Sequence, residues 1–227
     1  MKLRVFPNYQ ALSAQAADEI ISLVKDKPKA VLCLASGDTP RLTCKLLAER
    51  AILEKVDFRN ATFIGLDEWV GIPPENKGSC HYFFKQLLLG PMRFSKDQVH
   101  LFDALSTHLQ KECREMDEFI LSRGGIDLML VGIGMNGHIG FNEPGSSFDN
   151  YSHVADLDET TVRVGQKYFS GPMELEKGIT IGLKHLMESR KLILMANGIN
   201  KAGVISKATE GTVNATFPAS VVQLHAN

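Results

Sequence analysis

Residues 127–145, DLMLVGIGMNGHIGFNEPG, join a short apolar strand at 128–131 to a loop with glycines at 132, 134, 137, 140 and 145. His138 and Glu143 lie inside this loop, and Pro144 with the following glycine prevents a regular element from starting there. Glycines at this density suit a backbone that approaches a ligand closely beside a side chain that transfers protons. The stretch therefore predicts a buried strand that ends in an active-site loop.

The first glycines of the loop also match a dinucleotide-binding fingerprint, G-x-G-x-x-G, over residues 132–137. That fingerprint requires a helix directly after the turn, because the helix N-terminus has to meet the pyrophosphate. The residues that follow, HIGFNEPG, contain two more glycines and a proline and do not predict a helix. We therefore expect no nucleotide cofactor.

Outward from this loop, short apolar runs alternate with helical patterns along the chain. Strands are expected at residues 2–6, 30–35, 61–66, 126–131, 178–183 and 191–196. Helices are expected at residues 9–24, 40–50, 81–89, 106–123 and 200–210. This alternation predicts an α/β fold, a doubly wound and mostly parallel sheet with helices on both faces, Rossmann-like, as a single domain over residues 1–227.

Composition narrows the class of partner. The formal net charge of −1 over 227 residues gives no basic face for nucleic acid. No apolar run approaches the roughly 20 residues of a membrane span, and the first residues do not form a signal peptide. The four cysteines form no C-x-x-C pair, so free thiols in a reducing, cytoplasmic location are expected.

Unusual residues follow several of the expected strands, where ligands bind in such sheets. Ser36, Gly37, Asp38 and Thr39 precede Pro40, which suits the first helical position with Thr39 as N-cap. This turn is either an anion site at a helix N-terminus or a well-capped helix with no further role. The carboxylate of Asp38 opposes a bound phosphate unless it points away.

Two further strand ends carry charge. Asp67 and Glu68 follow a buried strand, and a partly buried Asp67 with a raised pKa suits a general base, although it could instead cap the next turn. Glu68 is expected to make a structural contact. Lys201 opens a helix, where its charge opposes the helix dipole unless it binds an anion; the alternative is a solvated lysine.

His138 itself has two interpretations. A single histidine can be structural, but here a glycine precedes it and a carboxylate follows it closely, so Glu143 is expected to set the orientation of the imidazole. A nucleophile elbow is missing, and so is a second His or Cys at ligand spacing. Neither a catalytic triad nor a metal site is indicated.

Together, S-G-D-T-P at 36–40, G-L-D-E at 65–68, G-I-G-M-N-G-H-I-G-F-N-E-P-G at 132–145, N-G-I-N-K at 197–201 and the terminal Leu224 and His225 resemble the glucosamine-6-phosphate deaminase family over nearly the whole chain. The resemblance implies conversion of glucosamine 6-phosphate and water into fructose 6-phosphate and ammonia, with no metal or organic cofactor. It implies that Asp67 moves the C2 proton to C1, and that His138, tuned by Glu143, opens the ring. The implied catalytic residues are Asp67, Asn136, His138 and Glu143, and the implied substrate-binding residues are Ser36, Gly37, Asp38, Thr39, Gly137, Lys167 and Lys201.

The chain departs from the family pattern at three places. Asn136 stands where many members have Asp, so Glu143 is expected to do more to stabilise a charged imidazole. Lys167 stands where many members hold the phosphate with an arginine, and Arg163 is a nearby alternative. The chain ends at Asn227, without the C-terminal extension of allosteric hexamers, which implies a monomer.

Two alternatives remain on the same fold. A 6-phosphogluconolactonase-type enzyme would hydrolyse an ester and move no C2 proton. A non-catalytic sugar-phosphate sensor would have no use for Asp67, and the chain carries no appended DNA-binding segment.

Overall fold

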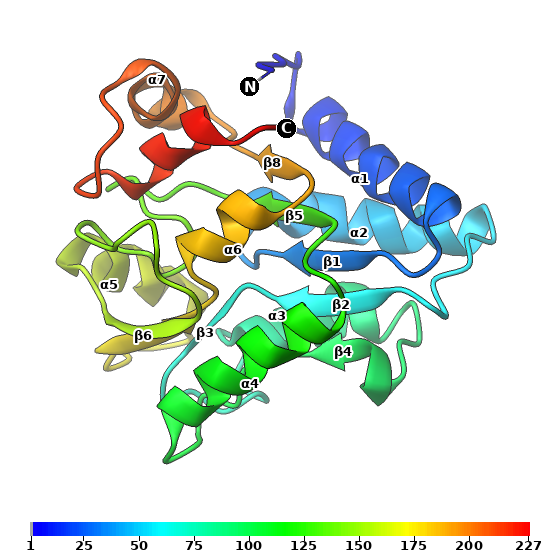
Figure 1. Ribbon diagram of the computed structural model, residues 1–227, viewed down its shortest axis with the longest axis horizontal. Coiled ribbons are helices and arrows are strands. Elements are labelled where there is room, and N and C mark those ends of the chain that lie inside the picture. The colour runs from blue at the N-terminus through cyan, green and yellow to red at the C-terminus, as the bar shows by residue number, and fades with distance from the viewer. Residues whose placement is uncertain (1) are drawn as a thin grey trace.

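The computed structural model describes residues 2–227, which contain a five-stranded and a three-stranded sheet (Figure 1). The strands are β1 Val31–Leu34, β2 Thr62–Gly65, β3 Asp67–Trp69, β4 Val99–His100, β5 Leu128–Val131, β6 His153–Asp156, β7 Lys177–Thr180 and β8 Leu192–Leu194. The α-helices are α1 Tyr9–Asp26, α2 Asp38–Leu53, α3 Cys80–Phe84, α4 Leu109–Ser122, α5 Glu159–Gly165, α6 Leu183–Glu188 and α7 Ala202–Glu210. Shorter 3₁₀ or π turns occupy Lys85–Leu89, Lys96–Gln98, Gln166–Tyr168, Ile199–Lys201 and Pro218–Leu224.

The larger sheet is parallel throughout, in the order β4-β2-β1-β5-β8. From β1 the chain builds outward through β2 and β4, and then returns to place β5 on the other side of β1. The order therefore reverses between β1 and β5. At such a switch point the two connections leave in opposite directions, which opens a crevice beyond the carboxyl ends of the strands.

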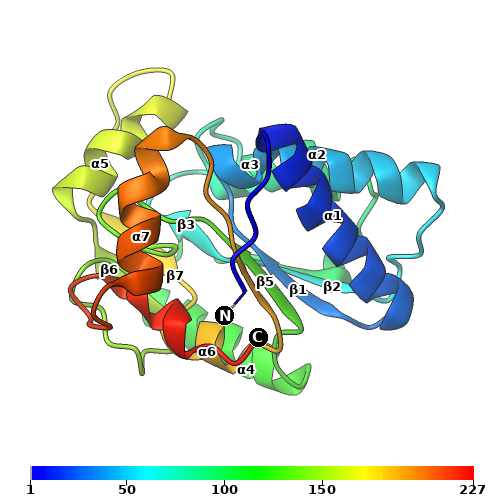
Figure 2. The ribbon, with the colours of Figure 1, turned by 90° about the horizontal axis from the view of Figure 1, so that it is seen from above.

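Helices cover both faces of this sheet, as Figure 2 shows, with α1 and α2 on one face and α4 and α6 on the other. In β1, Leu32 and Leu34 pack with the first pair of helices, while Val31 and Cys33 pack toward the second. Because both faces are covered, the strand is a continuous apolar run. The expected α/β fold with helices on both faces is confirmed. No helix among residues 2–227 has the length and apolar character needed to cross a membrane.

The smaller sheet, in the order β3-β7-β6, is antiparallel and corrects one prediction. Residues 178–183 were expected to form a strand of the main sheet, but β7 ends at Thr180 and pairs with β3 and β6 instead. The chain turns at Gly182, where a Cβ atom would come within 2.1 Å of the Asn150 carbonyl oxygen, and Leu183 then begins α6.

The expected strand at residues 2–6 is also wrong, because these residues form no strand. Leu3 and Val5 are 67% and 87% exposed, so the alternating apolar side chains gain little from burial. Beside this segment, at the sheet edge, the backbone N–H of Leu192 in β8 donates to the carbonyl of Asn227.

Asp127 is a buried carboxylate that ties the starts of β1 and β5 together. One carboxylate oxygen lies 2.7 Å from both Lys27 Nζ and Arg190 Nη1. The other oxygen accepts a 2.9 Å hydrogen bond from the backbone N–H of Val31. The carboxylate thus joins three separate segments at the amino end of the sheet, opposite the crevice.

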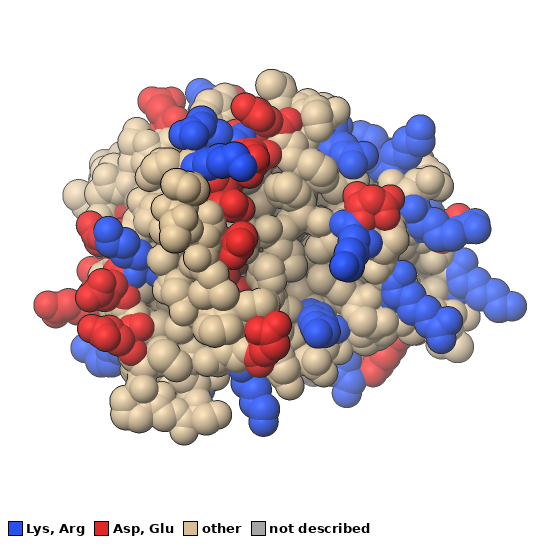
Figure 3. All heavy atoms as spheres, turned by 90° about the horizontal axis from the view of Figure 1, so that it is seen from below, with Lys and Arg blue, Asp and Glu red and all other residues tan. Residues whose placement is uncertain are grey.

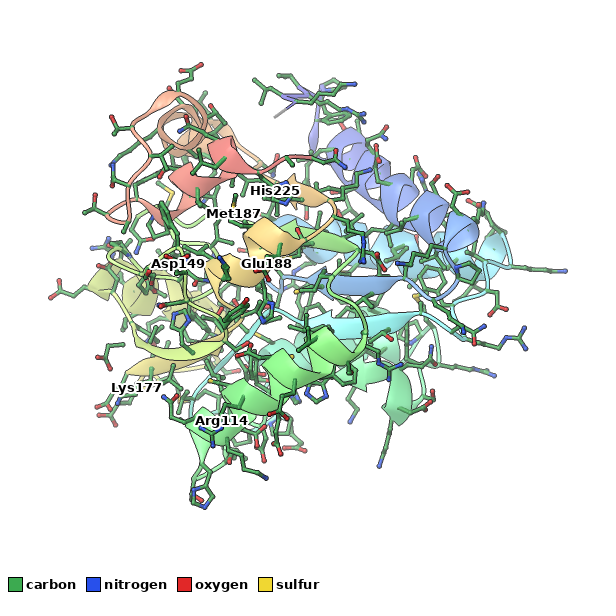
Figure 4. The ribbon with its side chains drawn as sticks, viewed as in Figure 1. Arg114, Asp149, Lys177, Met187, Glu188 and His225 are labelled. Atoms are coloured by element: carbon green, nitrogen blue, oxygen red, sulfur yellow. The ribbon has the colours of Figure 1, made fainter. Side chains whose placement is uncertain are left out.

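We predict that Asp127→Ala lowers the free energy of unfolding by about 2 kcal/mol, because it leaves the buried N–H of Val31 without its acceptor. Urea denaturation followed by circular dichroism measures the change. As a control, Asp149→Ala removes a carboxylate that is 87% exposed (Figure 4). Its ion pair with Lys184, at 3.5 Å, lies at the surface and contributes little, so the urea midpoint should not change. Equal midpoints for both variants would contradict the role of Asp127.

Candidate active site

A cleft of about 540 Å³ opens beyond the carboxyl ends of the parallel strands, at the switch point between β1 and β5. It brings together residues that are far apart in the sequence. The candidate residues that line it are Ser36, Gly37, Asp38, Thr39, Asp67, Asn136, His138, Lys167 and Lys201.

Two candidates stand behind the cleft wall. Gly137 is buried against Phe217, whose ring a Cβ atom would approach to 2.4 Å, and its carbonyl accepts from Ala219 N–H at 2.8 Å. Glu143 is 6% exposed and reaches the cleft through His138. Neither lines the cleft in the part of the chain that the structure describes. Gly137 thus shapes the loop, and Glu143 supports the histidine.

Asp67 enters the cleft from the first position of β3, two residues after β2 ends. Burial, followed by the negative charge of Glu68, raises the pKa of Asp67 to about 7. The Sγ atom of Cys80 lies 3.5 Å from Asp67 Oδ1, close enough for a weak S–H donor. A carboxylate with this pKa is a stronger base than an exposed aspartate, and about half of it is ionised at pH 7.

Glu68 points the other way and organises the backbone around α3. Its Oε1 accepts from the backbone N–H groups of Trp69 and Cys80 at 2.9 and 3.0 Å, and its Oε2 accepts from His81 N–H at 2.8 Å. The carboxylate is 2% exposed, so these hydrogen bonds compensate for its burial. The structural contact expected for Glu68 is confirmed.

Trp69 closes the cleft on the same side. Its side chain is 5% exposed, and its ring centroid lies 4.6 Å from that of Phe141 and 6.0 Å from that of Phe169. Phe141 belongs to the glycine-rich loop, so this aromatic packing joins β3 to that loop.

His138 faces a carboxylate and a hydroxyl through one ring nitrogen. Its Nδ1 lies 3.2 Å from Glu143 Oε2 and 2.9 Å from Thr161 Oγ1. Behind the ring, Gly134 leaves space that a side chain would take: a Cβ atom there would lie 2.2 Å from the imidazole. The close approach of backbone to ring is therefore one reason for a glycine in this loop.

Asn136 supports the carboxylate and does not contact the ring. Its Nδ2 donates to Glu143 Oε2 at 2.9 Å, and its Oδ1 accepts from the backbone N–H of His138 at 3.2 Å. Burial raises the pKa of Glu143, but the hydrogen bond and charge of His138, together with hydrogen bonds from Thr161 and Asn136, outweigh it, and the pKa is lowered overall. Glu143 is thus held as an anion beside the imidazole.

The second half of the glycine-rich loop is fastened to other segments. The side-chain Nδ2 of Asn142 donates to the carbonyls of Ile139 and Ile181 at 2.8 and 2.9 Å. The backbone N–H of Gly145 donates to the Ala215 carbonyl at 2.8 Å. No helix follows β5 directly, as expected from the residues after the G-x-G-x-x-G match.

The turn after β1 leads into α2, but the helix begins earlier than expected. Asp38 is its first residue and Gly37 its N-cap, with a φ of 104° that favours glycine. Thr39 as N-cap and Pro40 as first residue are therefore wrong. Proline is tolerated in the first turn because no intrahelical N–H bond is needed there. The free N–H groups of this turn border the cleft.

Two lysines lie at this end of the cleft. Lys167 Nζ is 2.7 Å from Asp38 Oδ2, so the Asp38 carboxylate already has a cation partner. Lys201 Nζ donates to the Ile133 carbonyl at 2.6 Å, and burial together with the charge of Lys167 lowers its pKa. Arg163 is exposed on α5 and, among residues 2–227, is not part of the cleft lining.

Thr161 and Cys80 were not singled out from the sequence, although each contacts a candidate residue directly. Neither lies in a recognisable motif, and only the packing of α3 and α5 brings them to the cleft. His225, part of the terminal pair noted in the sequence, lies elsewhere, beside the segment between α6 and β8 (Figure 4). No cluster of three His, Cys, Asp or Glu side chains suited to a metal occurs within residues 2–227.

Comparisons with known proteins agree with this geometry. The family model for glucosamine-6-phosphate isomerases and 6-phosphogluconolactonases matches residues 7–227. A glucosamine-6-phosphate deaminase of Thermoanaerobacter pseudethanolicus is 38% identical over 99% of this chain and 89% of its own length. The structure of a monomeric glucosamine-6-phosphate deaminase superposes with a TM-score of 0.96 at 34% identity, covering 100% of this chain and 95% of its own. A 6-phosphogluconolactonase from Thermotoga maritima shares the fold, with a TM-score of 0.76 at 21% identity over 96% of this chain and 92% of its own.

The raised pKa of Asp67 has a consequence for stability. An aspartate ionises near pH 4 in an unfolded chain and near pH 7 here, so the folded state binds more protons between these values. Stability from this group is therefore lost as pH rises from about 4 to about 7. We predict that Asp67→Asn is more stable than the parent protein at pH 8, by up to about 4 kcal/mol, and that the gap closes toward pH 4. Thermal unfolding across this pH range measures the gap; a constant difference would contradict the assignment.

Proposed function

Because the chain belongs to the family of glucosamine-6-phosphate isomerases and 6-phosphogluconolactonases, we propose that this cleft converts glucosamine 6-phosphate and water into fructose 6-phosphate and ammonia. The reaction is an aldose–ketose isomerisation with loss of the amino group. The observation that carries the proposal is the pairing of Asp67, a base with a pKa of about 7, with the supported imidazole of His138 in one cleft.

His138 opens the pyranose ring. It takes the proton from the C1 hydroxyl and returns a proton to the ring oxygen, which gives the open-chain aldehyde. The ionised Glu143 at 3.2 Å stabilises the imidazolium that exists between these transfers. No bond to the protein forms in this step.

Asp67 then moves hydrogen between the two carbons. Its carboxylate takes the C2 proton, which gives an enolamine, and the same group returns a proton to C1. The resulting imine at C2 adds water and releases ammonia, leaving the ketone of fructose 6-phosphate. Desolvation suits Asp67 to this task, because a carboxylate held against carbon is more basic than one in water.

The phosphate binds at the other end of the cleft. Lys201 and Lys167 supply positive charge, and the first turn of α2 supplies free N–H groups and the positive end of its dipole. Binding energy gained there positions C1 and C2 against Asp67. The Asp38 carboxylate has to turn away when the phosphate binds, because it already pairs with Lys167, one of the two lysines that would hold the phosphate.

The lactonase alternative shares the fold but not the need for Asp67 as a base toward carbon. Incubating the protein with glucosamine 6-phosphate and measuring ammonia separates the candidates. A deaminase releases ammonia in step with fructose 6-phosphate. Hydrolysis of 6-phosphogluconolactone without ammonia release would favour the lactonase, and saturable binding without turnover would favour a sensor.

We also propose that residues 1–227 act as one domain, because Ser36 and Lys201 from opposite ends of the chain line one cleft. A monomer is supported by the monomeric state of the deaminase of known structure that this chain matches. The four cysteines are free and buried, which fits the proposed cytoplasmic location. Figure 3 shows Lys and Arg interspersed with Asp and Glu on one face, and the formal net charge is −1, which fits a small-molecule substrate and not nucleic acid.

The roles of Asp67 and His138 can be separated in heavy water. Asp67→Asn keeps the shape but removes the base, so turnover should fall by about 10²–10⁴-fold, with no loss of hydrogen from substrate C2. His138→Gln should slow ring opening, while the small open-chain fraction still reacts and yields product with deuterium at C1. Proton magnetic resonance follows both positions. Near-normal turnover of Asp67→Asn with label at C1 would remove Asp67 from the mechanism.

Lys201→Ala should raise KM for glucosamine 6-phosphate about tenfold or more, with a smaller effect on kcat, because the lost contact binds substrate and transition state alike. Steady-state kinetics provide the measurement. Lys45→Ala, on the exposed side of α2 in a 3.8 Å ion pair with Glu49, is the matched control and should leave KM unchanged. A Lys201→Ala enzyme with the parent KM would show that this lysine does not hold the phosphate.

A further inference from the structure

The hydroxyl of Thr161 is the nearer of the two oxygens that face His138 Nδ1. It lies at 2.9 Å, against 3.2 Å for Glu143 Oε2. Thr161 is 4% exposed, so its hydroxyl is shielded from water and depends on these side chains for hydrogen bonds. The hydroxyl also contributes a hydrogen bond that lowers the pKa of Glu143. His138 Nδ1 therefore faces the Thr161 hydroxyl and the Glu143 carboxylate at the same time.

The donors and acceptors around His138 Nδ1 restrict the direction of each hydrogen bond there. The amide nitrogen of Asn136 can only donate, and it lies 2.9 Å from Glu143 Oε2 and 3.4 Å from Thr161 Oγ1. An ionised Glu143 can only accept. A hydroxyl both accepts and donates, so Thr161 can accept from Nδ1–H of His138 while donating its own hydrogen to Glu143.

We propose that Thr161 is a positioning residue for His138. Its hydroxyl accepts the hydrogen of Nδ1 and donates its own hydrogen to the Glu143 carboxylate. Nε2 is then left unprotonated and is the atom that opens the sugar ring. The inference rests on the proposed function and adds to it the atom that acts and the tautomer in which it acts.

The opposite arrangement would harm ring opening. With Nδ1 bare, the neutral ring would carry its hydrogen on Nε2, which could not take the proton from the C1 hydroxyl. The carboxylates near His138 are those of Glu143, Asp67 and Asp158. Of these, Glu143 contacts Nδ1 directly through Oε2. The same oxygen also accepts a hydrogen bond from the Asn136 amide. Thr161 thus provides the shorter of the two contacts that hold the Nδ1 hydrogen.

The position of Thr161 is set by the start of α5. Asp158 caps this helix by accepting from the backbone N–H of Thr160 at 2.8 Å, which places the next residue on the inner side of the first turn. Because a capped turn is rigid, the hydroxyl is held in place before substrate arrives. Preorganisation of this kind is what an imidazole on a glycine-rich loop requires.

Three variants test the proposal: Thr161→Val removes the hydroxyl and keeps the shape, Thr161→Ser keeps the hydroxyl, and Thr209→Val makes the same exchange on α7, where the hydroxyl bonds only within its helix. We expect Thr161→Val to lower kcat about ten- to a hundredfold, part of what a positioned acid–base group contributes, while KM stays close to that of the parent. Thr161→Ser should recover most of kcat, and Thr209→Val should match the parent. If Thr161→Val does not fold, Thr161→Ala carries the same test.

The tautomer is read directly by nitrogen magnetic resonance of protein labelled at histidine, with the His138 signals identified by their loss in His138→Gln. The parent and Thr161→Ser should show a protonated Nδ1 and a bare Nε2, whereas Thr161→Val should show a mixture. An unchanged tautomer in Thr161→Val, or a serine variant as slow as the valine variant, would overturn the proposal. This readout needs no turnover, so if the parent protein released no ammonia, the proposed function would fail while the role of Thr161 would still be decided.

Discussion

The parallel pairing of β1 with β2 on one side and β5 on the other is the constraint on which the rest of the structure depends. It places the carboxyl ends of all three strands at one edge, and the reversal of strand order at β1 leaves that edge open. At the opposite edge, Asp127 holds the starts of β1 and β5 in register through Val31, Lys27 and Arg190. One end of the sheet is therefore bound tightly, and the other is free to hold a ligand.

The groups proposed for proton transfer lie on different kinds of structural element. Asp67 belongs to a strand that pairs with β7, where it lies opposite Thr180, so its backbone cannot shift without disturbing the smaller sheet. His138 belongs to a loop whose second half is fastened through Asn142 and by hydrogen bonds to the C-terminal segment. Both groups are therefore held in place by the surrounding structure, Asp67 through strand pairing and His138 through the contacts of its loop. Glu68 helps to keep Asp67 in its buried position, because its carboxylate binds the backbone N–H groups of Trp69 in β3 and His81 in α3.

Much of this site could be predicted from the sequence, because the chemistry stands directly after strands with clear apolar signals. Ser36, Asp67 and His138 each follow such a strand, and parallel strands bring their ends together. The smaller sheet was not predictable, because β3, β6 and β7 are three or four residues long and mix polar with apolar side chains, as HVAD in β6 illustrates. At residues 2–6 the sequence predicted a strand that does not form. The apolar side chains alternate there as in a strand, but Leu3 and Val5 are largely exposed. Thr161 and Cys80 act through contacts between distant elements, which local patterns do not encode.

The sequence contains a single tryptophan, and the fold puts that residue, Trp69, in the wall of the cleft, two positions after Asp67. Its indole is almost fully buried and packs on Phe141 of the glycine-rich loop. Because the sequence has no other indole, the tryptophan emission of the protein comes from the wall of this cleft alone. The molecule thus carries its own fluorophore where ligands arrive, and loop movement or sugar binding can be followed optically without attaching a dye.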